Sequence, residues 1–96
     1  MDYDFVKHNV KTGKLTHLGS SSTIKGYLPY LPEMLDDNLT ELGCGIDRKD
    51  ELIGDFMCGK GRKAVRYGDY AFYLDKGVFD VYGNLRPNYK KREFPS

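Results

Sequence analysis

The chain has 96 residues, a formal net charge of +1 and a hydrophobic content of 40%, values typical of one globular domain with a single small core. Its apolar runs fall well short of the roughly 20 residues that a membrane-spanning helix needs. The acidic start Met1–Asp4 lacks the apolar segment of a secretory signal, so we expect a cytoplasmic protein that contacts no membrane.

The N-terminal part of the chain predicts a β-hairpin. Tyr3–Val10 and Leu15–Leu18 are rich in apolar and aromatic residues and indicate two strands. The turn between them contains Gly13, which can adopt the positive φ of a tight turn. The small polar residues of Gly19–Thr23 predict a loop after the second strand.

The middle of the chain predicts an extended segment and then a helix. Ile24–Pro32 contains two prolines, each of which removes a backbone donor and restricts the residue before it. We therefore expect this stretch to be extended, with Leu28 and Leu31 on the core. Pro32–Leu42 predicts a helix, because leucines recur on one helical face and Gly43 is a natural C-terminal stop.

A second helix is predicted to begin at Asp47, whose side chain can cap the first turn. Its apolar stripe consists of Leu52, Ile53, Phe56 and Met57, and the run Cys58–Gly61 ends it. Two short helices therefore follow the first hairpin.

The rest of the chain predicts β-structure. Lys63–Leu74 indicates one strand, or two pieces kinked at Gly68–Asp69. Asp75–Gly77 has the composition of a hairpin turn and Val78–Tyr82 that of a returning strand. The chain from Asn88 to Ser96 is a polar, basic tail, and its residues 89–96 are expected to be mobile unless something binds them.

Together these elements predict one α+β domain over residues 1–96. Hairpins at the two ends of the chain would form a single antiparallel sheet, and the two short helices would pack on one of its faces.

The cysteines and histidines give no metal site. Cys44 and Cys58 are expected to be free in a reducing cytosol, with a disulfide as the alternative outside the cell. His8 and His17 have no paired ligand spacing with a cysteine. We therefore expect neither a metal nor a cofactor, and no catalytic motif rises above chance.

Charge is divided unequally along the chain. Residues 1–58 contain 6 basic and 10 acidic side chains, whereas residues 59–96 contain 9 basic and 4 acidic ones. Basic residues interleaved with aromatic ones can hold phosphates and stack on bases. The candidate nucleic-acid or phosphate contacts are therefore Lys60, Arg62, Lys63, Arg66, Tyr67, Tyr70, Lys90, Lys91 and Arg92.

The two predicted helices carry the opposite charge. Residues 33–55 have a net charge of −6, and such a surface can imitate phosphates or attract a basic partner. The candidate partner-binding residues are Glu33, Asp36, Asp37, Glu41, Asp50 and Glu51. Their alternative role is that of ordinary solvated helix faces.

One family comparison concerns the C-terminal part. The run Arg66–Tyr70 is followed by the aromatic strand and turn, Val78–Tyr82 and the basic end. Together these residues resemble the C-terminal half of RelE-type ribonuclease toxins. The resemblance covers about a third of the chain and implies cleavage of messenger RNA by Arg, Lys and Tyr residues. The acidic helices depart from the basic helical hairpin with which such toxins usually begin.

The sequence thus favours a non-enzymatic small binding protein that docks on a macromolecular partner, either a protein or a nucleoprotein, and inhibits it. Phage and mobile-element accessory proteins, including inhibitors of bacterial defence nucleases, have this size and character. The alternatives are a nucleic-acid-binding protein, a RelE-like ribonuclease, and a chain whose oppositely charged halves pair between copies.

Overall fold

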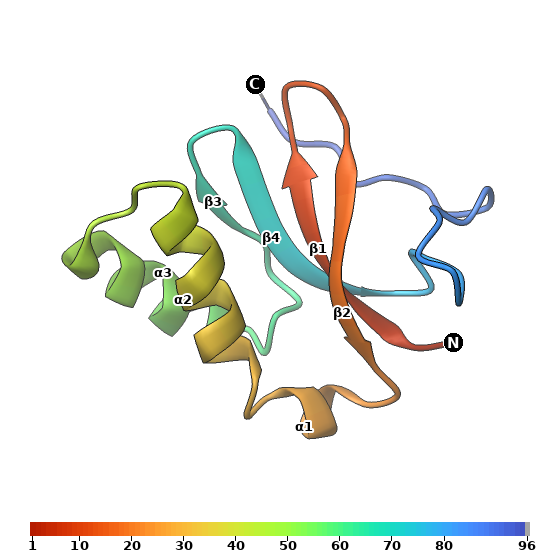
Figure 1. Ribbon diagram of the computed structural model, residues 1–96, viewed down its shortest axis with the longest axis horizontal. Helices are drawn as coiled ribbons and strands as arrows, with labels where there is room; N and C mark the ends of the chain where they lie inside the picture. The colour runs from red at the N-terminus through yellow and green to blue at the C-terminus, as the bar shows by residue number, and fades with distance from the viewer. Residues whose placement is uncertain (96) are drawn as a thin grey trace.

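The structure is a computed structural model that describes residues 1–95, and it has the predicted α+β architecture. Two hairpins from the two ends of the chain form one antiparallel sheet with strand order β2-β1-β4-β3, and the helices lie between them in sequence (Figure 1). The strands are β1 (Tyr3–Asn9), β2 (Leu15–Ser21), β3 (Val65–Tyr67) and β4 (Tyr70–Lys76). The helices are α1 (Ile24–Tyr27), α2 (Leu31–Glu41) and α3 (Ile46–Cys58).

The first hairpin is confirmed, but its second strand is longer than predicted. β2 pairs with β1 as far as Ser21, which lies opposite Tyr3 at the start of β1. The prediction of a loop at Gly19–Thr23 is therefore wrong for Gly19, Ser20 and Ser21, which continue β2. Glycine suits this site because a Cβ at Gly19 would overlap the hydroxyl of Tyr27.

The prediction that Ile24–Pro32 is extended is wrong. Thr23 caps a helical turn by accepting a hydrogen bond at Oγ1 from the backbone N–H of Gly26, at 3.0 Å. Pro29 follows the last residues of this turn, and Pro32 lies in the first turn of the next helix, so neither proline interrupts a helix interior. The predicted packing of Leu31 on the core is confirmed, since its side chain is fully buried.

The two main helices are confirmed, with one correction at the start of the second. α2 buries its leucine stripe at Leu31, Leu35 and Leu39. α3 begins at Ile46, with Gly45 in the capping position and no side-chain cap. Asp47 therefore does not cap the helix as predicted, because the chain enters the helix one residue earlier and places Asp47 inside the first turn.

The second hairpin is formed by different residues from those predicted. Gly68, at φ +58°, turns the chain between β3 and β4, as a tight hairpin turn requires. β4 then continues through Lys76 to pair with β1, so the predicted turn at Asp75–Gly77 and returning strand at Val78–Tyr82 are both wrong. Only an isolated bridge between Phe79 and Leu85 remains.

β4 has no edge left for a returning strand, because β1 pairs along its whole length and β3 occupies the other edge. On that second edge the N–H of Leu74 also donates to the carbonyl oxygen of Gly61 at 2.7 Å. The chain after β4 is bound instead by the buried carboxylate of Asp4. Oδ2 of Asp4 accepts hydrogen bonds from the N–H of Val78 at 2.9 Å and from that of Phe79 at 3.0 Å. Asp4 thereby fastens the chain that follows β4 to β1.

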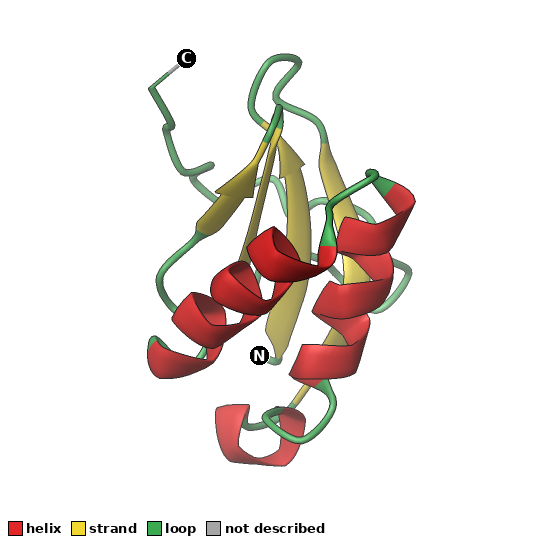
Figure 2. Ribbon diagram, turned by 90° about the vertical axis from the view of Figure 1, so that its left-hand side faces the viewer, coloured by secondary structure: helices red, strands yellow, loops and turns green. Residues whose placement is uncertain are grey.

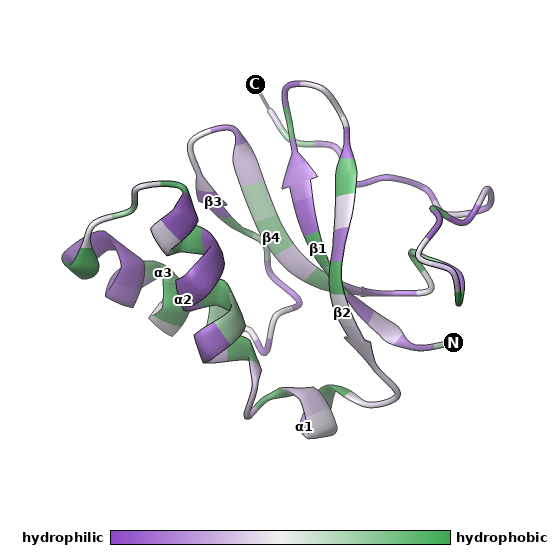
Figure 3. Ribbon diagram, viewed as in Figure 1, coloured by the Kyte–Doolittle hydropathy of each residue, from purple (hydrophilic) through white to green (hydrophobic). Residues whose placement is uncertain are grey.

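The helices cover one face of the sheet (Figure 2), and the apolar stretches of α2 and α3 alternate with hydrophilic ones (Figure 3). The core beneath the helices is a cluster of buried hydrophobic residues that includes the ring of Tyr27. Its fully buried members are Phe5, Leu31, Leu35, Leu39, Phe56 and Phe72.

The opposite face is covered by a segment without regular secondary structure, residues 78–95, which we call the C-terminal segment. Val6, Ala71 and Tyr73 of the sheet pack there against Val78 and Phe79. The predicted mobility of the tail from Asn88 stays a prediction, but its Tyr89 and Phe94 lie against this second core.

Candidate functional site

Three places gather polar or charged side chains: a groove beside α3, an acidic surface on α2 and α3, and a polar network beneath the C-terminal segment. Among residues 1–95, no helix is long and apolar enough to cross a membrane. No three His, Cys, Asp or Glu side chains within that range are placed to hold a metal ion. Both thiols are free, with Cys44 buried and Cys58 exposed.

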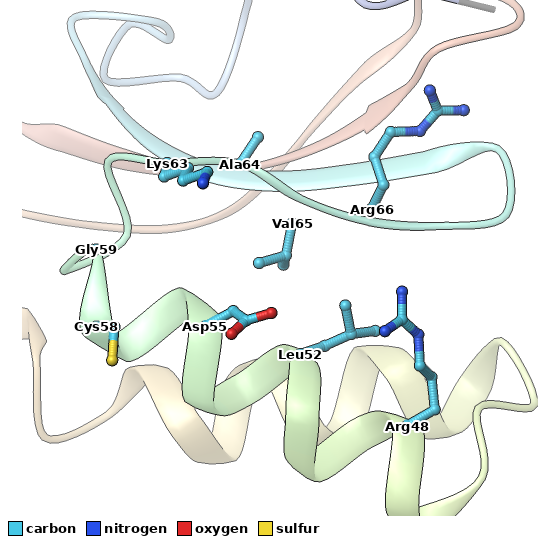
Figure 4. Close-up of a pocket in the computed structure, with 9 residues that line it drawn as sticks. All are labelled: Arg48, Leu52, Asp55, Cys58, Gly59, Lys63, Ala64, Val65 and Arg66. Carbon is cyan, nitrogen blue, oxygen red and sulfur yellow. The ribbon is translucent and has the colours of Figure 1, made fainter.

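The groove lies between α3 and the edge strand β3 and has a volume of about 550 Å³. Figure 4 shows Leu52 of α3 and Val65 of β3 pointing toward each other across it. Both are buried, so they form an apolar floor. Arg48 reaches from α3 toward β3 beside this floor, and Asp55 lies one helical turn beyond Leu52 (Figure 4).

The groove carries more positive than negative charge. Arg48, Lys63 and Arg66 line it together with a single carboxylate, that of Asp55. The Arg66 side chain points away from α3 (Figure 4), and its Nη1 donates to the carbonyl oxygen of Pro95 at 2.8 Å. The groove therefore has cations on both sides of the β3 edge.

The other predicted basic and aromatic residues do not join this groove. Tyr67 and Tyr70 pack against the core beneath the helices, so their rings are not free platforms for bases. Arg92 lies on the opposite side of the sheet, over the ring of Tyr73. The remaining basic residues are exposed and lie in loops or in the C-terminal segment. They are Lys60, Arg62, Lys90 and Lys91.

The residues behind the RelE-type resemblance do not converge either. The strand expected at Val78–Tyr82 is absent, and alternation along β3 places Tyr67 on the helix side and Arg66 on the other. The groove that Arg66 lines contains Lys63 but not Tyr67.

The acidic surface is an exposed stripe on α2, extended onto α3. Glu33, Asp37 and Glu41 follow one another at intervals of four residues, so they share one side of the helix, and all three are exposed. The other predicted members differ in their surroundings. Asp36 pairs with Lys49 at 3.2 Å, and Glu51 pairs with Arg48 at 2.8 Å.

Asp50 is exposed on α3. The surface therefore contains two kinds of carboxylate. Those of Asp36 and Glu51 have cationic neighbours, and Lys49 also joins the two helices by donating to Oγ1 of Thr40 at 3.1 Å. The three carboxylates of the α2 stripe form no ion pair with any residue in the range 1–95.

The polar network beneath the C-terminal segment was not predicted from the sequence. Asp75 accepts hydrogen bonds from the hydroxyl of Tyr89 at 2.8 Å and from Nε of Arg92 at 3.4 Å. The Arg92 guanidinium stacks 4.2 Å from the ring centre of Tyr73. A hydrogen bond of 2.9 Å then joins the Tyr73 hydroxyl to Nδ1 of His8.

Burial shifts the protonation of this network toward its neutral forms. Burial lowers the pKa of His8, and the nearby charges of Lys91 and Arg92 lower it further. Burial likewise raises the pKa of Tyr73. The pKa of Tyr89 is raised first by burial and then by its hydrogen bond to Asp75.

These shifts do not make the network a catalytic site. His8 and Tyr73 are buried, so a substrate would reach them only after the C-terminal segment had moved. Each hydrogen bond instead fastens the segment or the strands to one another. The one signal in the sequence was alternation, which places Asp4 and His8 on the same face of β1 as Val6.

Comparisons with known proteins add no further indication of function. No family model, no curated protein and no solved structure matches this chain. Its function is therefore inferred from its own residues.

Proposed function

We propose that this protein is a non-enzymatic binding protein that docks through the acidic surface of α2 and α3 on a basic region of a macromolecular partner. The supporting observation is the stripe of Glu33, Asp37 and Glu41. Its carboxylates are exposed, equally spaced and without an ion pair among residues 1–95. Cations supplied by a partner protein or nucleoprotein would complete these pairs.

The spacing of the carboxylates favours a row of partner cations over full mimicry of a duplex. One helical turn advances about 5.4 Å, so the stripe carries roughly one charge per turn. Duplex DNA carries one charge per about 1.7 Å of its axis. The stripe is thus too sparse to replace a duplex by itself, but it can occupy part of a nucleic-acid-binding surface.

Docking at such a surface would inhibit the partner, because the same cations could no longer hold a nucleic acid. We propose this inhibitory role in the cytoplasm, of the kind performed by phage or mobile-element proteins that act against bacterial defence nucleases. Small size and two free thiols support that setting.

The test compares two charge-reversed variants in capture from a bacterial lysate, with the bound proteins identified by mass spectrometry. Asp37→Lys/Glu41→Lys reverses the stripe, whereas Asp2→Lys/Asp69→Lys makes the same charge change at exposed positions elsewhere. We expect the first variant to lose a basic partner that the wild type and the second variant retain. Equal capture by all three proteins would contradict the proposal.

Circular dichroism checks that both variants are folded, since exposed substitutions change stability by only about 0.5 kcal/mol. Capture should also weaken as salt is added, because exposed charges more than about 10 Å apart are screened at 0.1 M ionic strength. Capture that is insensitive to salt would point to an apolar interface instead.

A further inference from the structure

We propose that the groove between α3 and the edge of β3 binds an extended acidic segment of another protein, which adds to the sheet as a fifth strand beside β3. The groove lies apart from the stripe on α2, so this inference goes beyond the function proposed above and stands independently of it.

The first observation is the hydrogen-bonding register of β3. The two-residue turn at Gly68–Asp69 makes Tyr67 and Tyr70 a hydrogen-bonded pair. Alternation then makes Val65 and Phe72 the next such pair and leaves the backbone N–H and C=O of Arg66 directed outward. β3 is the last strand of the sheet, so no strand of residues 1–95 receives these groups.

The second observation is the place of this edge in the molecule. Natural proteins commonly cover an exposed edge, protect it with proline or a bulge, or keep it short and charged. β3 is short, with three residues, so an occupant needs contacts beyond the strand itself. Such contacts are available because the edge opens into the groove of about 550 Å³, which has α3 as its opposite wall. A cleft between a strand edge and a helix is suited to an extended peptide, whose main chain pairs with the strand and whose side chains enter pockets.

The third observation is the charge around the groove, which selects the occupant. Side chains of an added strand would alternate between the two faces of the sheet. Those on the helix side would lie near Arg48 and the apolar floor at Leu52, and those on the other side near Arg66. A strand that alternates acidic and apolar residues fits both sides, with apolar side chains on the floor at Leu52 and carboxylates beside Arg66. Arg48 is paired with Glu51 at 2.8 Å. Lys63 and Arg66 still leave the groove with an excess of positive charge over Asp55.

A nucleic-acid strand fits the same groove less well. Phosphate oxygens can accept from the N–H of Arg66 but cannot donate to its C=O, whereas a peptide backbone does both. Base stacking, which supplies much of the affinity for single strands, has no platform here because Tyr67 and Tyr70 pack against the core. The geometry therefore favours a peptide.

The experiment uses fluorescence anisotropy with a labelled eight-residue peptide of alternating Glu and Val, capped at both ends. The matched probes are an alternating Lys and Val peptide and an eight-nucleotide single-stranded RNA. We expect saturable binding of the Glu-Val peptide, at least tenfold tighter than binding of either other probe. Equal binding of the two peptides, tighter binding of RNA, or no saturable binding would overturn the proposal.

Two variants separate strand addition from simple charge attraction. Arg66→Ala removes the guanidinium but keeps the outward N–H, whereas Arg66→Pro removes both and leaves the hydrogen bonds between β3 and β4 in place. One backbone hydrogen bond changes affinity by about tenfold or less, so we expect Arg66→Pro to bind the peptide about threefold to tenfold more weakly than Arg66→Ala. Equal affinity for the two variants would exclude pairing at this edge.

A second measurement keeps the test decisive if Arg66→Pro fails to fold. Hydrogen exchange of the wild type with and without the Glu-Val peptide reports which edge is covered. We expect slower exchange at the amide of Arg66 and unchanged exchange along β2, the other edge of the sheet. Protection at β2 alone, or at neither edge, would overturn the proposal.

Asp37→Lys/Glu41→Lys should leave peptide affinity unchanged within about twofold, because the stripe and the groove are different surfaces.

Discussion

The two faces of the sheet are covered in different ways. On the helix side, α2 and α3 place apolar residues on apolar residues, and the core contains no charged group. On the other side, the C-terminal segment is attached through Asp4, Asp75 and Arg92, whose polar atoms bond to partners far away in sequence. His8 bonds to Tyr73 beneath this segment. One layer is therefore held by the hydrophobic effect, which is non-directional, and the other depends also on directional hydrogen bonds.

This difference determines how each face should respond to change. An apolar core loses stability in proportion to the volume removed and is insensitive to pH. A polar attachment depends on the presence of individual donors and acceptors and on their protonation. The following predictions test that contrast, from the largest expected effect to the smallest.

The largest effect is expected from a cavity on the helix side. Phe56 is fully buried and packs against Phe5, with ring centres 5.5 Å apart. Phe56→Ala should reduce the free energy of unfolding by about 3–5 kcal/mol, as measured by urea denaturation. Val81, which is 89% exposed, supplies the control, and Val81→Ala should change stability by less than about 0.5 kcal/mol.

The second effect concerns the C-terminal side. Asp4→Ala would leave the N–H groups of Val78 and Phe79 without their acceptor, and we expect a loss of about 2–3 kcal/mol. Asp4→Asn keeps an acceptor oxygen and should cost less. If the alanine and asparagine variants were equally stable in the same denaturation experiment, the two hydrogen bonds would not hold the segment.

The same contrast explains which parts of the fold the sequence predicts. The helices and the first hairpin follow from periodicity, because leucines such as Leu35 and Leu39 reveal their buried side at a spacing that can be read locally. The boundary between β4 and the C-terminal segment cannot be predicted from such a periodicity. It depends on Asp4, whose partners at Val78 and Phe79 are distant in sequence and show no local pattern.

For the candidate surfaces, sequence reasoning reached the residues but not their grouping. The acidic stripe follows from helical spacing, but only the fold shows that Lys49 neutralises Asp36 while Asp37 has no ion pair among residues 1–95. The groove could not be predicted, because it requires α3 and β3 to face one another. The sequence groups the basic and aromatic residues as a single set, whereas the alternation of side chains along β3 places Arg66 and Tyr67 on opposite faces of the sheet.

The third prediction is a loss of stability at acidic pH that arises on the C-terminal side. Because the folded protein holds the pKa of His8 below its ordinary value of 6.5, the unfolded chain binds a proton first as the pH falls. The contribution of neutral His8 to the free energy of unfolding should therefore be fully present above pH 6.5. It should be lost as the pH falls from 6.5 toward the lowered pKa. We expect this decline in denaturation experiments at a series of pH values.

Two variants identify the group responsible for the decline. His8→Asn should flatten the decline, whereas Tyr73→Phe removes the hydrogen-bond partner of His8 but keeps the titrating imidazole and hence most of the slope. A slope that is unchanged in His8→Asn would assign the pH dependence to another group.

The smallest effect is expected from Arg92, which is half-buried. Its guanidinium donates to the carbonyl oxygens of Arg62 at 3.0 Å and Leu74 at 3.3 Å. Arg92→Ala should lower stability by about 1 kcal/mol and speed amide exchange in residues 89–95, with exchange in α2 and α3 unchanged. Arg92→Lys keeps the charge but not the fork of donors, so its exchange rates should lie between those of the wild type and the alanine variant.

The position of β1 has a consequence for how the chain folds during synthesis. β1 is made first, but it lies between β2 and β4, and Tyr3 at its start pairs with Lys76 at the end of β4. A first hairpin that formed while the ribosome was making the helices would have one complete pairing and one open edge. Docking of the β3–β4 hairpin on that edge is a long-range event, and such events slow folding. Until it occurs, the nascent chain exposes an unpaired strand edge of the kind that promotes aggregation.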